Sequence, residues 1–124
     1  MNIKPTRTRT LLLVEDTDIL RDLLEFALES HHFVVVAKSS FAAGLRAIQK
    51  QEYFAIITDQ FLGDGHGTDL LEEAKVEQPN ALRYLMSSAP EPKGHCAHTF
   101  LSKLDPAPLQ QRLLIAIEKA GSRK

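Results

Sequence analysis

Short apolar runs alternate along this chain with segments whose apolar residues recur at helical spacing. Runs of this length, bounded by turn residues, are typical of strands that are buried on both faces. Strands alternating with helices form a parallel sheet with right-handed crossovers. The five runs that we interpret as strands are residues 11–14, 33–37, 54–57, 81–86 and 99–102.

This pattern predicts an α/β fold, a flavodoxin-like doubly wound five-stranded parallel sheet with the default strand order 2-1-3-4-5. The amphipathic segments between the strands carry residues that start helices. Thr17 or Asp18 begins the first helix, and Thr68 is expected to cap the third. Pro106 and Pro108 are expected to open the last one.

Composition indicates one ordinary globular domain. The chain has 124 residues, of which 44% are hydrophobic and 25% charged, with a formal net charge of -1. That balance favours neither nucleic acid nor a membrane surface as a partner. We expect a flexible tail at residues 1–10 and a single domain at residues 11–121, too short to include an output domain. The one cysteine, Cys96, permits no internal disulfide, so a reducing, cytoplasmic setting is expected.

Chemistry-bearing side chains follow the predicted strands where the strands end. Glu15 and Asp16 follow the first strand, Asp59 the third, Ser88 the fourth and Lys103 the fifth. Parallel strands bring their carboxyl ends to one edge of the sheet, which is where open α/β sheets build their sites. Taken alone, Asp59 could equally be a site residue or the first residue of a turn. The other four positions favour a site.

The residue types at this edge describe a phosphoryl-transfer site. Three crowded carboxylates repel one another, and a hard divalent cation such as Mg²⁺ relieves that repulsion while accepting phosphate oxygens. Lys103 supplies a point charge for a phosphoryl oxygen, and Ser88 supplies a hydroxyl donor. In such a site an aspartate is the nucleophile.

In these positions the chain resembles the receiver domains of two-component response regulators, over about residues 10–121. The resemblance rests on the acidic pair Glu15-Asp16, on Asp59, on Ser88-Ala89 and on Lys103. It implies that Asp59 accepts a phosphoryl group from a histidine kinase or a histidine phosphotransfer protein. It also implies signalling by binding to a downstream protein, whose identity the sequence leaves open, rather than catalysis on a separate substrate.

The resemblance further implies roles for individual residues. Asp16, Asp59 and the backbone carbonyl of Phe61 would bind Mg²⁺, and Glu15 would reach it directly or through water. Ser88 and Lys103 would hold the acyl phosphate. Phe100, three residues before the lysine, matches the aromatic residue that changes conformation on phosphorylation. Ser88 matches the hydroxyl residue of the same switch.

The chain departs from the family's pattern in two loops. Leu104 stands where a proline usually follows the lysine, and Gly63 replaces the usual proline in the loop after Asp59, which we expect to loosen that loop. A trans Lys103–Leu104 peptide bond could displace the lysine.

The crossover at residues 87–98 is short and contains Pro90, Pro92 and Gly94. Prolines exclude an early helix, and the remainder has no amphipathic repeat. We therefore predict that the family's fourth helix is absent or shortened to one turn. His95 and His98 are interpreted as side chains of a flexible, solvated loop rather than as metal ligands.

Two other functions compete with the phosphoacceptor. A degenerate receiver would be a scaffold that binds partners without phosphorylation. Alternatively, Asp16-Thr-Asp18 after an apolar strand resembles the nucleophile motif of haloacid-dehalogenase-like phosphatases. The aspartate that forms the acyl phosphate, Asp59 or Asp16, distinguishes the phosphatase from the receiver.

Overall fold

The computed structural model describes residues 9–121. Of the predicted tail, residues 1–8 lie outside this range. Arg9 and Thr10 are described: Thr10 begins the first strand, and the Arg9 guanidinium lies 4.6 Å from the centroid of the Phe54 ring. Within the described part of the chain, no helix has the length and apolar character needed to cross a membrane.

Five parallel strands form the central sheet, in the spatial order β2-β1-β3-β6-β7. Because β4 and β5 form a separate small hairpin, this order is the predicted 2-1-3-4-5 arrangement. Neighbouring strands pair in parallel throughout, which confirms the fold predicted from the sequence. The strands are β1 Thr10–Val14, β2 Val34–Lys38, β3 Ala55–Asp59, β6 Leu82–Ser87 and β7 Thr99–Ser102.

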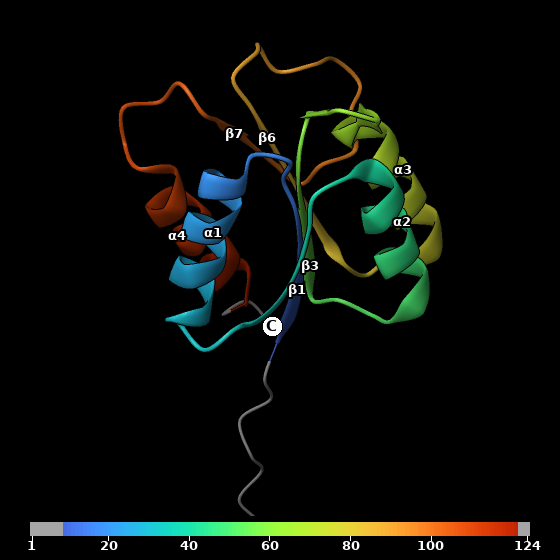
Figure 1. Ribbon diagram of the computed structural model, residues 1–124, viewed down its shortest axis with the longest axis horizontal. Helices are drawn as coiled ribbons and strands as arrows, with labels where there is room; N and C mark the ends of the chain where they lie inside the picture. The colour runs from blue at the N-terminus through green and yellow to red at the C-terminus, as the bar shows by residue number, and fades with distance from the viewer. Residues whose placement is uncertain (1–8, 122–124) are drawn as a thin grey trace, which may run out of the picture.

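The four helices of residues 9–121 cover the sheet in two layers (Figure 1). Helices α1 (Asp18–Glu29) and α4 (Leu109–Gly121) lie against one face, and α2 (Phe41–Lys50) and α3 (Gly67–Glu77) lie against the other. Side chains of β1 alternate between the two cores because successive strand residues point to opposite faces. Leu11 and Leu13 join the core with α1 and α4, whereas Leu12 and Val14 join the core with α2 and α3. Burial on both faces explains why the strand runs are continuously apolar.

Two sequence expectations about the helices need correction. Thr68 does not cap α3, which begins at Gly67; instead the Gln60 side-chain oxygen accepts a hydrogen bond from the Thr68 N–H at 2.9 Å. The last helix begins at Leu109, after both prolines. Ile19 of α1 and Val76 of α3 are apolar but 83% and 77% exposed, so they lie outside the buried faces of these helices.

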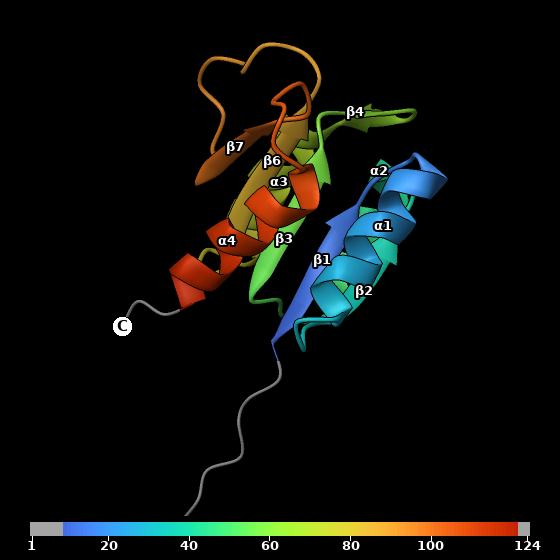
Figure 2. The ribbon, with the colours of Figure 1, turned by 90° about the vertical axis from the view of Figure 1, so that its left-hand side faces the viewer.

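No helix joins β6 to β7, as predicted. Residues 88–98 cross above the sheet as an irregular segment (Figure 2). The buried Arg83 of β6 ties this segment down, since its Nε donates to the Cys96 carbonyl at 2.9 Å. His98 pairs with the same residue, donating its N–H to the Arg83 carbonyl at 2.8 Å and accepting the Arg83 N–H on Nδ1 at 3.0 Å.

The interpretation of His95 as a solvated side chain is wrong. Its Nε2 lies 2.7 Å from a Glu91 carboxylate oxygen, and its Nδ1 accepts the Ala97 N–H at 3.1 Å. The imidazole ring also packs near Phe100, with the centroids 6.2 Å apart. These partners come from within the crossover and from β7, so the segment has its own local hydrogen-bond network in place of a helix.

We expect Arg83→Met to destabilise the fold by about 1–3 kcal/mol, because it leaves the partly buried Cys96 carbonyl without its donor. Urea unfolding measures this loss, and hydrogen exchange should accelerate in residues 88–98. Lys93→Met is the matched control, since Lys93 is exposed in the same crossover. Equal stabilities for the two variants would contradict the role given to Arg83.

Candidate acidic site at the carboxyl edge of the sheet

Three charged side chains reach the same side of the sheet because they share the strand periodicity. Glu15 follows β1 directly, Asp59 ends β3, and Lys103 follows β7 directly. The residues two positions before them all lie in the core with α1 and α4: Leu13, Ile57 and Leu101. Since side chains alternate along a strand, Glu15, Asp59 and Lys103 point toward the same face.

Lys103 bridges two buried carboxylates. Its Nζ lies 3.0 Å from Glu15 Oε1 and 3.0 Å from Asp59 Oδ1. The side chains of Lys103, Glu15 and Asp59 are 16%, 0% and 9% exposed. A buried carboxylate requires pairing to remain charged, and one ammonium here serves two of them.

Burial shifts the titration of all three groups. It raises the pKa of Asp59 above its usual value, although the hydrogen bond and charge of Lys103 oppose this. Burial likewise raises the pKa of Glu15, and the negative charge of Asp59 raises it further. The hydrogen bond from the Thr17 N–H and the contact with Lys103 act in the opposite direction and lower this pKa. Burial alone would lower the pKa of Lys103, but bonds to Asp59 and Glu15 outweigh it and raise that pKa. The site therefore carries excess negative charge that is costly to keep.

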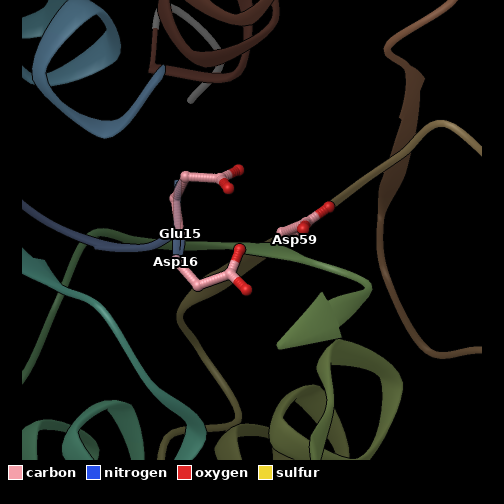
Figure 3. A group of neighbouring side chains, drawn as sticks. All are labelled: Glu15, Asp16 and Asp59. Carbon is pink, nitrogen blue, oxygen red and sulfur yellow. The ribbon is translucent and has the colours of Figure 1, made fainter. Parts of the chain in front are cut away.

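Asp16 completes an acidic group with Glu15 and Asp59 (Figure 3). One ligand oxygen from each of the three lies within 4.8 Å of the others, and Asp16 is exposed. Oxygen ligands with an open side suit a hard divalent cation that keeps some of its waters. The group can thus hold a metal ion, and a bound cation would offset the negative charge that burial makes costly at Glu15 and Asp59.

The chain around Glu15 fixes its position. The Glu15 Oε2 accepts the Thr17 N–H at 3.1 Å, and the Glu15 carbonyl accepts a hydrogen bond from Arg21 Nη1 at 2.8 Å. Arg21 also pairs with Asp18 at 2.6 Å. The first turn of α1 is thereby tied back to the end of β1.

A hairpin follows Asp59, where the sequence predicted a loosened loop. Strands β4 (Phe61–Leu62) and β5 (Gly65–His66) pair antiparallel across the turn that contains Gly63. The Asp64 carboxylate at this turn accepts the Phe41 N–H at 2.7 Å and the Ala42 N–H at 3.0 Å, at the start of α2. The replacement of proline by Gly63 therefore does not leave the loop untethered.

Gly67 marks the closest approach of this loop to the site. A Cβ atom at this position would overlap the Asp59 carbonyl oxygen, and the Gly67 N–H donates to the Gln60 carbonyl at 2.7 Å. The start of α3 can pack directly against the end of β3 only without a side chain here.

The remaining predicted residues lie around the acidic group. Ser88 is exposed, one residue past β6. Phe61 is 53% exposed and meets the His66 ring edge-on, with centroids 5.7 Å apart. Phe100 packs against the core with α2 and α3, the face opposite to the one that Lys103 reaches. The Lys103–Leu104 peptide bond is trans, yet Lys103 still reaches both carboxylates.

Comparison with known proteins decides the family. The family model described as "Response regulator receiver domain" matches residues 11–105. The chain belongs to this family. Receiver domains are modules of two-component signalling, so the acidic group lies in a signalling domain. The phosphatase alternative is not supported by this family assignment. No curated protein sequence matches the chain.

Solved receiver structures share the fold at low sequence identity. A CheY-like receiver domain protein from Methanospirillum hungatei JF-1 is 22% identical, with a TM-score of 0.84, covering 92% of this chain and 94% of its own. A signal receiver domain of an HD domain-containing protein from Pseudomonas fluorescens Pf-5 is 22% identical, with a TM-score of 0.83 and coverages of 97% and 92%.

A third structure is a response regulator protein from Burkholderia pseudomallei with a phosphorylated aspartic acid, calcium ion and citrate. It is 19% identical, with a TM-score of 0.76, and the match covers 91% of this receiver and 71% of that chain. At these identities the likeness establishes the fold alone.

Sequence reasoning missed the residues that support the site from a distance. Asp64 and Gln60 act through hydrogen bonds to the first turns of α2 and α3, and Arg21 acts through a carbonyl. The two residues of the hairpin turn are Gly63 and Asp64, and this Gly-Asp pair was the one signal for the hairpin. No pattern in the sequence indicates the long-range contact of Asp64 with Phe41.

We expect Gly67→Ala to disturb the site strongly, because the added methyl group would overlap backbone atoms of Asp59. A loss of about 1–3 kcal/mol in the free energy of unfolding is expected from such overpacking. Gly63→Ala is the control from the same loop, since nothing lies within 4 Å of a Cβ there. Similar losses in the two variants would contradict this account.

Asp64→Ala should lower stability at neutral pH and lose that effect in acid. Bonds from the Ala42 and Phe41 N–H groups hold the pKa of Asp64 below its ordinary value of 3.8. A lowered carboxyl pKa contributes stability above the unfolded value and loses it as pH falls through the folded one. The urea midpoints of wild type and variant should therefore converge below pH 3.8. A constant difference down to the folded pKa would show that the carboxylate charge is irrelevant.

Proposed function

We propose that residues 11–121 form a phosphoacceptor receiver domain that accepts a phosphoryl group on Asp59, with Mg²⁺ bound beside it. The observation that carries this proposal is the Lys103 ammonium, 3.0 Å from both Asp59 and Glu15, with Asp16 completing the acidic group. Asp59 is the acid of this group that lies at the end of the central strand and contacts the lysine directly. A histidine kinase or a histidine phosphotransfer protein supplies the phosphoryl group.

Mg²⁺ supplies charge neutralisation for the incoming phosphoryl group. Asp16, Asp59 and the Phe61 carbonyl would hold it, with Glu15 at the margin, where it already pairs with Lys103. The three acidic oxygens fit a cation because they lie within 4.8 Å of one another. Three crowded carboxylates also repel one another, so a cation beside them is favoured over three separate charges.

The chain's own residues then position and neutralise the group on Asp59. Asp59 provides the attacking carboxylate oxygen, and a lysine that already contacts this carboxylate can pair with a phosphoryl oxygen. Ser88 lies one residue past the neighbouring strand and provides a hydroxyl donor for another oxygen. Phe100 reports the change by moving relative to the crossover, where it now packs near His95.

The relative from Burkholderia pseudomallei supports this proposal by analogy, since its structure contains a phosphorylated aspartic acid and a calcium ion. The competing scaffold function predicts that partner binding is independent of Asp59. The complete acidic group and the lysine bridge favour the phosphoacceptor, because a scaffold has no need to keep two buried carboxylates around one ammonium.

Incubation with acetyl phosphate and Mg²⁺, followed by intact-mass analysis, tests the proposal. The wild type should gain one phosphoryl group, and Asp59→Asn should gain none. Asp22→Asn, an exposed change on α1, should behave as the wild type. Omitting Mg²⁺ should abolish the gain.

Three outcomes would contradict the proposal. Phosphorylation of Asp59→Asn at Asp16 would favour the phosphatase mechanism. No gain of mass by the wild type, together with unchanged NMR spectra on adding beryllofluoride and Mg²⁺, would favour the scaffold. An unchanged gain without Mg²⁺ would contradict the metal's role.

A further inference from the structure

A groove runs along the outer edge of the sheet, beside strand β2. It lies between edge strand β2 and helix α2 and encloses about 190 Å³. Three cations line it, and its lining contains no acidic residue. The main lining side chains are Val36, Lys38, Arg46, Ala47, Lys50 and Tyr53.

The three cations of the groove are not neutralised from within the described chain. Among residues 9–121, no ion pair involves Lys38, Arg46 or Lys50, although the chain as a whole is slightly acidic. Arg46 and Lys50 are exposed, and Lys38 is half-buried. Like charges gathered without counter-charges repel one another, so a bound anionic group would be stabilised there.

Strand β2 offers a free edge beside these cations (Figure 2). Among residues 9–121 it pairs only with β1, so no described strand lies on its outer side. The Val34 N–H bonds to Arg9 and the Lys38 carbonyl accepts from Glu15, so alternate residues turn their main-chain groups toward β1. The intervening Val35 and Ala37 therefore turn theirs outward, where an added strand would bind.

The spacing of the cations matches an extended chain better than a single small anion. Arg46 and Lys50 are one helical turn apart, about 6 Å along the axis of α2. In an extended strand, side chains on the same face recur every two residues, or about 6.6 Å. Carboxylates at alternate positions of a strand paired with β2 can therefore meet Arg46 and Lys50 in turn.

We propose that the β2–α2 groove binds an extended acidic peptide segment of a partner protein, which adds a strand to the β2 edge. Main-chain hydrogen bonds to Val35 and Ala37 provide the pairing. Acidic residues at alternate positions contact the cations, and the small apolar residues between them lie on the opposite face of the sheet, the face of Val35. This binding mode does not involve Asp59, so it stands apart from the phosphoacceptor function.

NMR titration of the labelled chain with the acetylated, amidated peptide Val-Glu-Val-Glu-Val tests the proposal. The amides of Val35 and Ala37 should show the largest shifts, and a peptide with lysines in place of the glutamates should cause none. Asp59→Asn should bind the acidic peptide as the wild type does, which separates this result from the phosphoacceptor test. Shifts centred on any other surface would overturn the proposal.

Variants separate the contribution of main-chain pairing with β2 from that of the groove cations. Ala37→Pro removes one outward N–H and should abolish binding while leaving the β1 ladder intact, since proline is tolerated at a strand edge. The double variant Arg46→Glu, Lys50→Glu should weaken binding at least about tenfold, whereas Lys75→Glu on α3 should change it less than about twofold. A correctly folded Ala37→Pro protein that binds normally would overturn strand addition.

A small anion provides the last discriminating outcome. If inorganic phosphate shifts the amide signals of the groove residues and the peptide leaves the signals of Val35 and Ala37 unchanged, the groove is a simple anion site and the proposal fails. If the peptide moves these amides and phosphate competes only weakly, the extended peptide is the occupant.

Discussion

The contact of one ammonium group with two buried carboxylates holds the carboxyl edge of this receiver together. Lys103 arrives from the edge strand β7, and the acids Glu15 and Asp59 from the two strands at the centre of the sheet. Removing one member of such a buried group typically costs about 3–5 kcal/mol, because the partners are left charged and unpaired. The registers of β1, β3 and β7 therefore have to be correct at once for the site to exist. Asp16, the third acid of the group, is exposed to solvent.

The sequence was sufficient for the fold and for the membership of the acidic group, because both depend on strand periodicity. Apolar runs identify strands buried on both faces, and residues just past such runs meet at one edge. The same reasoning predicted the helix-free crossover from Pro90 and Pro92. It could not reveal that Arg83 is buried and holds that crossover, since an arginine in a strand reads as an exposed side chain.

Errors of interpretation occurred where a side chain forms hydrogen bonds within an irregular segment. Gln60 accepts the Thr68 N–H from the preceding loop, and His95 is bonded to Glu91 and Ala97 within the crossover. Hydrophobic periodicity does not indicate such contacts, because they depend on the path of the loop backbone rather than on a repeat of apolar residues. Helix boundaries and loop structure were consequently less predictable than strand order.

The Asp64 carboxylate has a consequence for how any change at Asp59 would travel through the molecule. The hairpin that follows Asp59 is joined at its turn to the first two N–H groups of α2. A displacement of the hairpin must therefore break both bonds or carry the start of α2 with it. The segment between β6 and β7 contains no helix, whereas α2 is hydrogen-bonded to the hairpin beside Asp59. Motion at the centre of the sheet would then be transmitted sideways, toward the edge strand that α2 flanks.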